Sequence, residues 1–459
     1  MRILHAFAIA AATSAAGGAA SDWPPSGQPE QRVMAMPGST QEAGVGHLSE
    51  WSRETKRRFL VDWQAARMSE WIIVQGNEGG DLDSMVAALT WAYHLQHSST
   101  QNASSRPVKA IALLQTPTDA LDLRPENKAA LRNARMTPGH SDLLTVEELP
   151  EDPQTLSDAI RGVVLVDHPV PLRRWGGAPI LSIFDHHEDR GAGPDARPRI
   201  FERVASCTTI VARQMLDELE RLPAEYHLPH ELLELILSAI AIDSRGLRGA
   251  VDADRKTADR VLRRSAWRGA DLDSKMGELS DDLGAAKKDI HHLGLRDLLR
   301  RDWKGDLVDT PSPRTPTVSL GFSSIPYSLE EQIQKKTNFK ELFDWFAIES
   351  AWTAQIGADI SVALNKHKVR DENGKKRTVR EIVLVVRHDV RIDERQADSL
   401  FHAVVDAVER SKELQVKPWH RADELGRRQM VWTHENAGAG RKVVRPIIEA
   451  AVEAWDMDT

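Results

Sequence analysis

The sequence is poor in the features that define several classes of protein. Among 459 residues there is one cysteine, Cys207, which excludes an internal disulfide framework and any cysteine-rich zinc site. Beyond the N-terminal segment no run is apolar for long enough to span a bilayer, and no internal repeat is present. The net charge is −8, so the average field of the protein repels polyanions. We therefore expect no nucleic-acid or membrane partner, and a phosphate-rich ligand would need a localised basic pocket.

What is present is the composition of a soluble globular protein. Hydrophobic residues make up 41% and charged residues 28% of the chain, and its length suits two domains with separate cores. Cys207 lies in the segment Ser206-Cys207-Thr208-Thr209, directly before an apolar helix. We expect the hydroxyl groups of this segment to cap the helix and the thiol to be buried.

The first residues differ from the rest of the chain. A basic start, a short apolar core and a small-residue stretch up to Ser21 resemble a secretory leader. The absence of acidic residues before Asp22 also fits a mitochondrial presequence, and an uncleaved alanine-rich extension is a third interpretation. We expect a leader over residues 1–21 and a flexible linker, rich in Pro, Gly, Ser and Gln, over residues 22–49.

A glycine-rich stretch, residues 76–84, carries Asp81 and Asp83. The apolar run 71–74 before it predicts a buried strand, and the apolar segment from Met85 predicts a helix. Ligands of open α/β sheets bind at the carboxyl ends of the strands, and carboxylates suit Mg²⁺ or Mn²⁺. The same residues are typical of a capped helix start, so this stretch alone equally fits a purely structural role.

Three further apolar runs, 108–114, 163–166 and 180–184, predict strands with helical segments between them. This alternation favours a doubly wound parallel sheet. Polar residues follow two of these strands and an apolar helix at 232–242. They are Asp167 and His168 after the third strand, Asp185, His186 and His187 after the fourth, and Asp243 after the helix.

The sequence becomes polar around residues 265–280, where we place a domain boundary. The first domain is predicted over residues 50–270 and the second over residues 275–459. The second contains a helical stretch around residues 296–304, several strands and a final helix. The predicted strands are residues 318–322, 358–364 and 381–386.

The polar residues at the predicted strand ends are the main functional signal. Each is weak alone, because an aspartate after a strand often caps a helix and a histidine pair often belongs to a hydrogen-bonded loop. Their joint occurrence, in order and at one edge of the sheet, is hard to explain by structure alone. Carboxylates with one or two imidazoles suit a pair of divalent cations that hold a phosphoryl group and activate water.

The order Asn-x-x-x-Asp-x-Asp, Asp-His, Asp-His-His and a later Asp resembles the DHH phosphoesterase superfamily over residues 71–246. The second half resembles the second DHH-associated domain through residues 301–304, 321–324 and 440–442. The resemblance implies an α/β fold of two domains, a doubly wound parallel sheet followed by a smaller mixed-sheet domain, with the active site in the cleft between them. Members of this type include family II inorganic pyrophosphatases, eukaryotic exopolyphosphatases and prune-type proteins.

The resemblance also implies two divalent cations, Mg²⁺ or Mn²⁺ with Co²⁺ as a further option, and a role for each matching residue. The implied metal ligands are Asn77, Asp81, Asp83, Asp167, His186 and Asp243, with Asp167 bridging both ions. The implied roles in catalysis fall to Asp167 and His187, and the implied contacts to substrate phosphate come from His187, Lys304, Arg441 and Lys442. The cations of the second domain would supply the positive charge that this acidic protein otherwise lacks.

Three details distinguish the subfamilies. Family II pyrophosphatases carry His at the position of Asn77, whereas exopolyphosphatases of the superfamily carry Asn. Prune-type proteins often have Asp-His-Arg where this chain has the intact motif at residues 185–187. Exopolyphosphatases usually have Asp-His-Asn at the second motif, and here Pro169 replaces that Asn.

These details predict a metal-dependent exopolyphosphatase that acts on inorganic polyphosphate. The alternatives are an inorganic pyrophosphatase or a nucleotide phosphodiesterase on the same scaffold, and a prune-like interaction protein with incidental phosphatase activity. The resemblance implies a cytoplasmic protein, whereas a functional leader would direct secretion or mitochondrial import.

Overall fold

The computed structural model describes residues 47–99, 108–137, 141–221, 227–370, 372 and 374–456. The predicted leader and most of the predicted linker lie outside the described residues. Helix α1 (His47–Gln64) includes the last three residues assigned to that linker, 22–49. Across the described ranges, no helix has both the length and the hydropathy that crossing a membrane requires.

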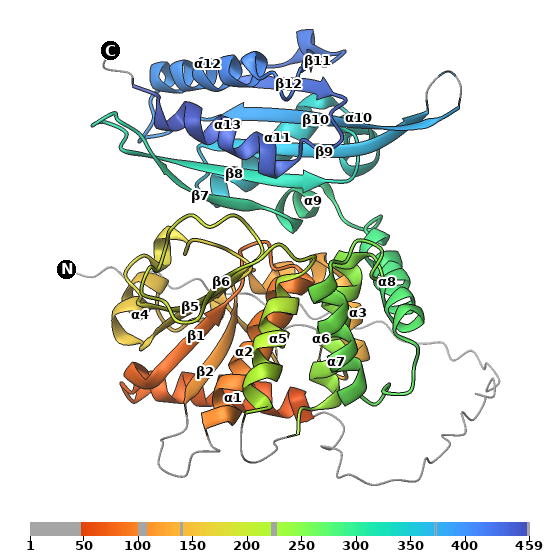
Figure 1. Ribbon diagram of the computed structural model, residues 1–459. Coiled ribbons are helices and arrows are strands. Elements are labelled where there is room, and N and C mark those ends of the chain that lie inside the picture. Colours follow the sequence, from red (N-terminus) through yellow and green to blue (C-terminus); the bar gives the residue numbers. More distant parts are fainter. Residues whose placement is uncertain are drawn as a thin grey trace, which may run out of the picture. The chain divides into compact units, whose positions relative to one another are not determined.

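The first half of the described chain contains a six-stranded sheet in the order β3-β2-β1-β4-β5-β6, and all its neighbouring strands are parallel (Figure 1). This confirms the predicted doubly wound sheet. Its strands are β1 (Trp71–Gln75), β2 (Lys109–Leu114), β3 (Leu144–Thr145), β4 (Gly162–Val166), β5 (Ile180–Asp185) and β6 (Arg199–Phe201). Its helices after α1 are α2 (Leu82–Ser99), α3 (Pro125–Asn133), α4 (Pro153–Ala159), α5 (Cys207–Leu219), α6 (His230–Ser244), α7 (Asp252–Arg264) and α8 (Leu272–Lys288), with the short 3₁₀ helix η2 (Thr118–Leu123).

Both faces of this sheet are covered. Ile72 and Val74 of β1 pack into one core with α2, α5 and α6, whereas Trp71 and Ile73 pack into another with α1 and α4. Successive strand side chains point to opposite faces, so a strand buried on both faces is apolar at every position. This burial explains why β1, β2, β4 and β5 are predominantly apolar in the sequence.

Helix α8 lies on the C-terminal side of the predicted domain boundary. Its residues Met276, Leu279 and Leu283 nevertheless pack into the core of the first half, beside α6 and α3. The core of the first half therefore extends beyond the predicted boundary at residues 270–275. The composition of the sequence does not reveal this, because α8 combines its buried apolar residues with a polar exposed face.

The second half contains a six-stranded sheet in the order β11-β12-β10-β9-β8-β7. Only β8 and β9 are parallel, and the other neighbours are antiparallel, which confirms the mixed sheet. The strands are β7 (Lys304–Asp309), β8 (Thr317–Ile325), β9 (Ile360–Arg370), β10 (Lys376–Val386), β11 (Lys417–Pro418) and β12 (Gln429–His434). The helices are α9 (Leu295–Arg301), α10 (Leu329–Lys336), α11 (Leu342–Gln355), α12 (Glu394–Arg410) and α13 (Arg441–Glu453).

The predicted helical stretch around residues 296–304 is partly wrong. Helix α9 ends at Arg301, Asp302 leaves the helical conformation with a φ of −132°, and Lys304 is the first residue of β7. The ladder of β7 with β8 supplies backbone partners for this segment, so tertiary pairing overrides the local helical pattern.

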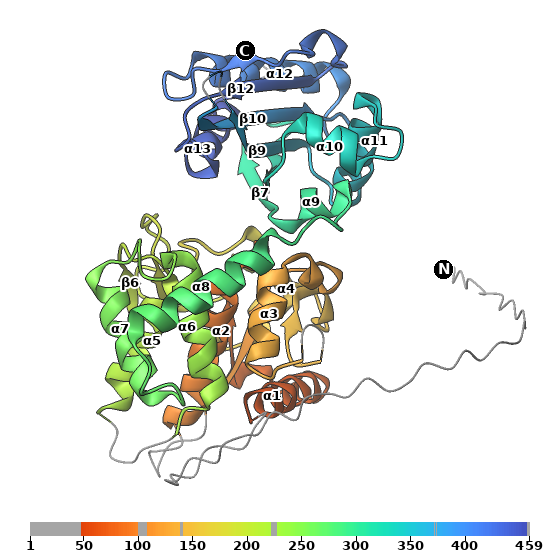
Figure 2. The ribbon, with the colours of Figure 1, turned by 90° about the vertical axis from the view of Figure 1, so that its right-hand side faces the viewer.

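Helices cover both faces of the second sheet as well, with α12 and α13 on one side and α10 and α11 on the other (Figure 2). The core beneath α9, α10 and α11 also contains Ala120 and Leu123 from η2 of the first half. The described halves therefore share buried apolar contacts around η2 and α9.

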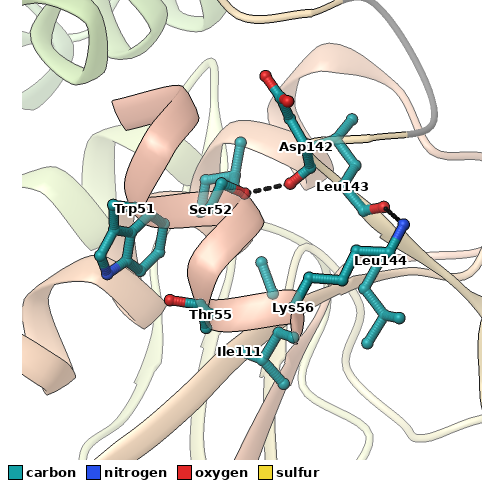
Figure 3. A pocket seen from close by; sticks show the side chains of 10 residues that line it. Trp51, Ser52, Thr55, Lys56, Ile111, Asp142, Leu143 and Leu144 are labelled. Atoms are coloured by element: carbon teal, nitrogen blue, oxygen red, sulfur yellow. Dashed lines mark hydrogen bonds between the residues drawn. The ribbon is translucent and has the colours of Figure 1, made fainter. Parts of the chain in front are cut away.

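A small cavity of about 10 Å³ lies under α1, lined by Trp51, Ser52, Lys56 and Asp142 among others (Figure 3). It has room for about one water molecule. Asp142 accepts a hydrogen bond from Ser49 at 2.6 Å, and Lys56 donates to the carbonyl of Leu143 at 2.8 Å. These contacts attach α1 to the sheet, so we interpret the cavity as a packing feature.

Candidate functional site

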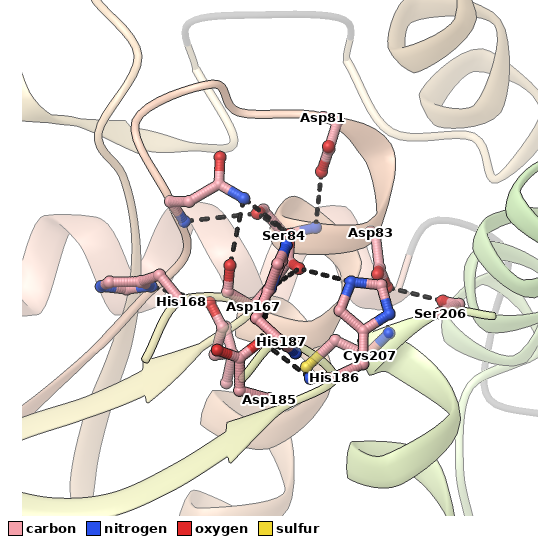
Figure 4. A network of polar contacts seen from close by, with 12 residues as sticks. Asp81, Asp83, Ser84, Asp167, His168, Asp185, His186, His187, Ser206 and Cys207 are labelled. Carbon is pink, nitrogen blue, oxygen red and sulfur yellow. Dashed lines mark hydrogen bonds and ion pairs between the residues drawn. The ribbon is translucent and has the colours of Figure 1, made fainter. Parts of the chain in front are cut away.

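Three neighbouring parallel strands end at the candidate site. Strand β1 pairs with β4, and β4 pairs with β5, so their carboxyl ends meet at one edge of the sheet. The glycine-rich turn follows β1, Asp167 follows β4 directly, and β5 ends at Asp185, before His186 and His187. Figure 4 shows the side chains from these strand ends converging on one another. The fold thus brings together motifs that lie far apart in the sequence.

Asp167 is buried at the centre of this group. Its Oδ2 accepts hydrogen bonds from Asn77 Nδ2 at 2.7 Å and from Ser84 Oγ at 2.5 Å, and its Oδ1 lies 3.2 Å from His186 Nε2. The φ of Asp167 is +62°, a left-handed conformation that is uncommon outside glycine, although aspartate and asparagine adopt it more readily than other residues. Such strain persists only where the surroundings enforce it, and it clusters at functional sites.

Different acceptors orient the two histidines. His186 Nδ1 lies 3.2 Å from the carbonyl oxygen of Val204, which leaves Nε2 facing Asp167. His187 Nδ1 lies 2.8 Å from Asp185 Oδ1, and the same oxygen accepts the backbone amides of both histidines. The Asp185 carboxylate therefore holds both the backbone of the two histidines and the imidazole ring of His187 in place.

The donor atoms of this group fit a divalent metal ion. One ligand atom each from Asp167, Asp185, His186 and His187 lies within 4.8 Å of the others. Asp185 Oδ2 is buried and has no hydrogen-bond partner among the described residues, which is costly for a carboxylate unless a cation approaches it. Carboxylates and imidazoles whose outer nitrogens bond to carbonyl or carboxylate oxygens are typical metal ligands. Asp185 is absent from the ligands predicted from the sequence.

Asp83 is buried and acts as the N-terminal cap of α5. Its carboxylate accepts the backbone amides of Cys207 and Thr208, each at 2.7 Å. The hydroxyls of Ser206 and Thr208 donate to Asp83 at 2.6 and 2.7 Å, so the prediction that these hydroxyls cap the helix is wrong. Cys207 is buried as predicted, and burial raises the pKa of its thiol.

Asp81 caps the helix that follows it. Its Oδ1 accepts the backbone amide of Ser84 at 3.1 Å, in the first turn of α2. Burial opposes ionisation of Asp81, but the charges of Lys304 and Arg124 outweigh that effect and lower its pKa below the ordinary value. Asp81 therefore has the helix-capping role that the sequence left open, and the cationic side chains of Lys304 and Arg124 also act on its carboxylate.

Asp243 ends α6 and is exposed to solvent. The surrounding protein and the neighbouring charges of Asp83 and Asp81 raise the pKa of its carboxyl well above the ordinary value. Burial and the charge of Asp167 likewise raise the pKa of Asp83 to about 6. These carboxylates are close enough to repel one another, although they lie outside the tight group of Asp167, Asp185, His186 and His187.

Against the opposing effect of burial, the carboxylates of Asp167 and Asp83 raise the pKa of His186 to about 10. The carboxylates that favour the protonated form of His186 would also attract a metal cation. Metal binding at such a site is expected to displace that proton.

Asn77 contacts the centre of the site through its amide. Nδ2 donates to Asp167 Oδ2, and Oδ1 accepts the backbone amide of Gly79 at 2.9 Å. The structure thus places Asn77 beside the carboxylate that we expect to bridge two ions, with its oxygen directed to its own turn. Its role as a metal ligand stays a prediction.

The predicted phosphate-binding cations of the second half differ in their surroundings. Arg441 is the first residue of α13, and its Nη2 donates to Asp302 Oδ2 at 2.6 Å and to Ser324 Oγ at 2.7 Å. Its Nη1 is buried and has no partner among the described residues. Lys304 passes close to Gly79, where an added Cβ would lie 2.6 Å from its Cε. Lys442 is exposed, and within the described ranges no hydrogen bond or ion pair joins it to the site.

Arg124, which no sequence pattern singles out, links the glycine-rich turn to the second half. It is buried, and its Nε donates to the carbonyl oxygen of Gly79 at 2.7 Å. Its Nη2 lies 3.1 Å from Asp302 Oδ1. Asp302 therefore joins Arg124 to Arg441 and holds both guanidinium groups near Asp81.

The turn itself depends on Gly80, whose φ is +53°. A Cβ at this position would lie 1.8 Å from Thr116 Oγ1. We expect Gly80→Ala to lower the free energy of unfolding by about 2 kcal/mol or more, because it adds a left-handed conformational cost to a clash. Urea unfolding measures this loss. Gly269→Ala, where an added Cβ meets nothing within 4 Å, is the control. An equal effect of the two changes would show that neither the backbone conformation of Gly80 nor the clash with Thr116 causes the loss.

Comparisons with known proteins agree with this geometry. Residues 281–451 match the DHHA2 domain. The chain is 26% identical over 328 residues to a Schizosaccharomyces pombe protein provisionally named an exopolyphosphatase, which covers 69% of this chain and 80% of that protein. It is 28% identical over 243 residues to exopolyphosphatase PRUNE1 of Bos taurus, over 50% of this chain and 49% of that protein.

A solved structure shares the fold. The crystal structure of a Methanococcus jannaschii protein, described as a candidate family II inorganic pyrophosphatase, matches with a TM-score of 0.50 and 17% identity, over 83% of this chain and 99% of that one. At this identity the similarity concerns the fold alone. The domain match, the relatives and the fold agree with the order of motifs at the sheet edge, and together they support an exopolyphosphatase-like protein of the DHH superfamily.

Proposed function

We propose that the protein releases the terminal phosphate of inorganic polyphosphate, using two divalent cations, Mg²⁺ or Mn²⁺, with Co²⁺ as a further option. The relatives named as exopolyphosphatases indicate a hydrolase of phosphoanhydride bonds. The observation that carries the proposal is the strained, buried Asp167, which lies among imidazoles and carboxylates at a sheet edge that Lys304 and Arg124 also reach.

In the proposed site, Asp167 would serve both cations, Asn77 and Asp81 would hold the first, and Asp83, His186 and Asp243 would hold the second. When bound, the cations polarise the terminal phosphate and lower the pKa of a water molecule. The carboxylate of Asp185 and the carbonyl of Val204 hold the imidazoles in their orientations, so little reorganisation is needed when the site is filled.

The chain's own cations would neutralise the phosphate groups. Arg441 has a buried Nη1 without a partner, and Asp302 and Ser324 fix the rest of its guanidinium group. A fixed planar guanidinium binds phosphate oxygens with little loss of side-chain freedom. His187, held by Asp185, would contact substrate phosphate through Nε2.

A panel of substrates tests the proposal. Phosphate release from long-chain polyphosphate, tripolyphosphate and pyrophosphate, and AMP formation from cyclic AMP, would be measured with Mg²⁺, Mn²⁺ or Co²⁺. We expect the highest kcat/KM on a polyphosphate. A clear preference for pyrophosphate or for cyclic AMP would favour the pyrophosphatase or phosphodiesterase alternative. Product formation no faster than that of an Asp167→Asn variant on every substrate would favour a prune-like interaction protein.

Asn77→His tests the subfamily assignment. The substitution introduces the residue that family II pyrophosphatases carry, and imidazole suits Mn²⁺ and Co²⁺ better than an amide does. We expect roughly tenfold tighter Mn²⁺ binding by titration calorimetry. An unchanged affinity would show that residue 77 does not contact the first ion.

A further inference from the structure

A second polar region adjoins the glycine-rich turn. A cavity of about 710 Å³ begins at Glu78 and Gly79 and continues between residues of η2, the loop after β4, α9 and β7. Trp303 and Trp352 form part of its wall, in edge-to-face contact at 4.8 Å. Five arginines line it: Arg173, Arg174, Arg296, Arg300 and Arg301.

Four acidic residues also line the cavity, so its net charge is small, and the pairing of each arginine matters. Three of the five arginines form ion pairs with carboxylates. The pairs are Arg173 with Asp309 at 2.6 Å, Arg300 with Asp119, and Arg301 with Glu126 at 3.4 Å. Arg296 donates to the neutral side chain of Gln355 at 2.9 Å.

Arg174 differs from the other largely buried arginines of the cavity, Arg300 and Arg301, which form ion pairs with carboxylates. Its Nε is buried without a hydrogen-bond partner, and within the described part of the chain no carboxylate lies at ion-pair distance from it. Burial lowers the pKa of its guanidinium group, and the more distant charges of Glu78 and Asp306 oppose this effect without cancelling it. An unpaired buried charge is costly, so the fold keeps a cation there that an anionic ligand can stabilise.

Arg174 is connected to the candidate active site through Gln115. Its Nη2 donates to Gln115 Oε1 at 3.1 Å, and Gln115 Nε2 donates to the carbonyl oxygen of Gly76 at 2.7 Å. Trp175 Nε1 donates to the same Gln115 oxygen at 3.2 Å. Arg174 is therefore held next to the turn that carries Asn77 and Asp81, on a loop that begins with Asp167.

We propose that this cavity binds the part of a phosphate chain that extends beyond the reacting end, and that Arg174 is its specificity-determining residue. The inference rests on the proposed action on polyphosphate. A long chain can occupy the cavity, whereas pyrophosphate has only one phosphate group beyond the one that reacts. Arg174 thereby favours long chains over pyrophosphate.

The test compares Arg174→Gln with Arg57→Gln. Arg57 is exposed, pairs with Glu54 and does not line the cavity, so it is a control for the loss of one arginine. We expect Arg174→Gln to raise KM for chains of many phosphates roughly ten- to a hundredfold, because one charge-assisted contact is lost. KM for pyrophosphate and kcat should change less than about twofold, and Arg57→Gln should change neither parameter.

A binding measurement without turnover gives a second readout. In the presence of a chelator, long-chain polyphosphate should raise the melting temperature of the wild type more than that of Arg174→Gln. The ligand-free variant should melt no lower than the wild type, since an unpaired buried charge has been removed. Equal KM changes on long and short substrates, or equal protection of both proteins by polyphosphate, would overturn the inference while leaving the proposed function intact. A wild type that hydrolyses no polyphosphate would instead refute the proposed function.

Discussion

Asp167→Asn is expected to lower kcat for polyphosphate at least a thousandfold while the protein stays folded. The carboxylate lies at the centre of the site, with Asn77 and Ser84 on one oxygen and His186 on the other. Asparagine retains the size and can adopt the left-handed backbone that this position requires, but it lacks the charge. Loss of about 4 kcal/mol of transition-state stabilisation corresponds to roughly a thousandfold in rate.

Single-turnover and steady-state phosphate release measure this effect, and circular dichroism and melting temperature monitor the fold. Asp189→Asn is a suitable control, because Asp189 is exposed and its ion-pair partner is Arg199, which is not a member of the cluster. Its activity should match that of the wild type. A folded Asp167→Asn protein with activity within tenfold of the wild type would refute the central role of this carboxylate.

Arg441→Ala is expected to raise KM for polyphosphate roughly tenfold or more and to make KM more sensitive to salt. The substitution removes the guanidinium whose free Nη1 we propose to bind phosphate, and it leaves Asp302 with Arg124 as its partner. Fewer charge-assisted contacts then hold the substrate, so screening by salt weakens those that remain.

Lys442→Ala provides the comparison for Arg441. The two residues are adjacent and were predicted to act together. Lys442, however, is exposed, and among the described residues no hydrogen bond or ion pair joins it to the site. We expect KM of Lys442→Ala to change less than about threefold in steady-state assays at two salt concentrations. Equal effects of the two substitutions would show that charge at the start of α13 matters and the position of the Arg441 guanidinium does not.

The sequence predicts the frame of the fold well, because long strands buried on both faces appear as apolar runs. β1, β2, β4 and β5 are of this kind. β3 and β6, with two and three residues, are too short to carry a periodic signal. Strand β7 was predicted as helix in part, since its pairing with β8 is a tertiary contact that no local pattern contains.

The motifs at the strand ends also led to the centre of the site, Asp167, His186 and His187. The remaining polar contacts depend on tertiary structure. Asp83 was predicted as a metal ligand, but its hydrogen bonds to α5 could not be predicted, because that helix follows much later in the chain. Arg124 and Arg174 belong to no motif, and only their burial and their partners, or lack of partners, distinguish them from other arginines.

The proposal that the protein removes terminal phosphates is tested most directly by a ³¹P NMR time course of long-chain polyphosphate with the full chain and Mg²⁺, which is diamagnetic. Release from the end of the chain predicts that orthophosphate appears from the start, while the signal of internal phosphates falls and the number of chain ends stays constant. The same sample with Asp167→Asn should remain unchanged. An early rise in chain ends without orthophosphate, or no change with the wild-type protein, would contradict the account.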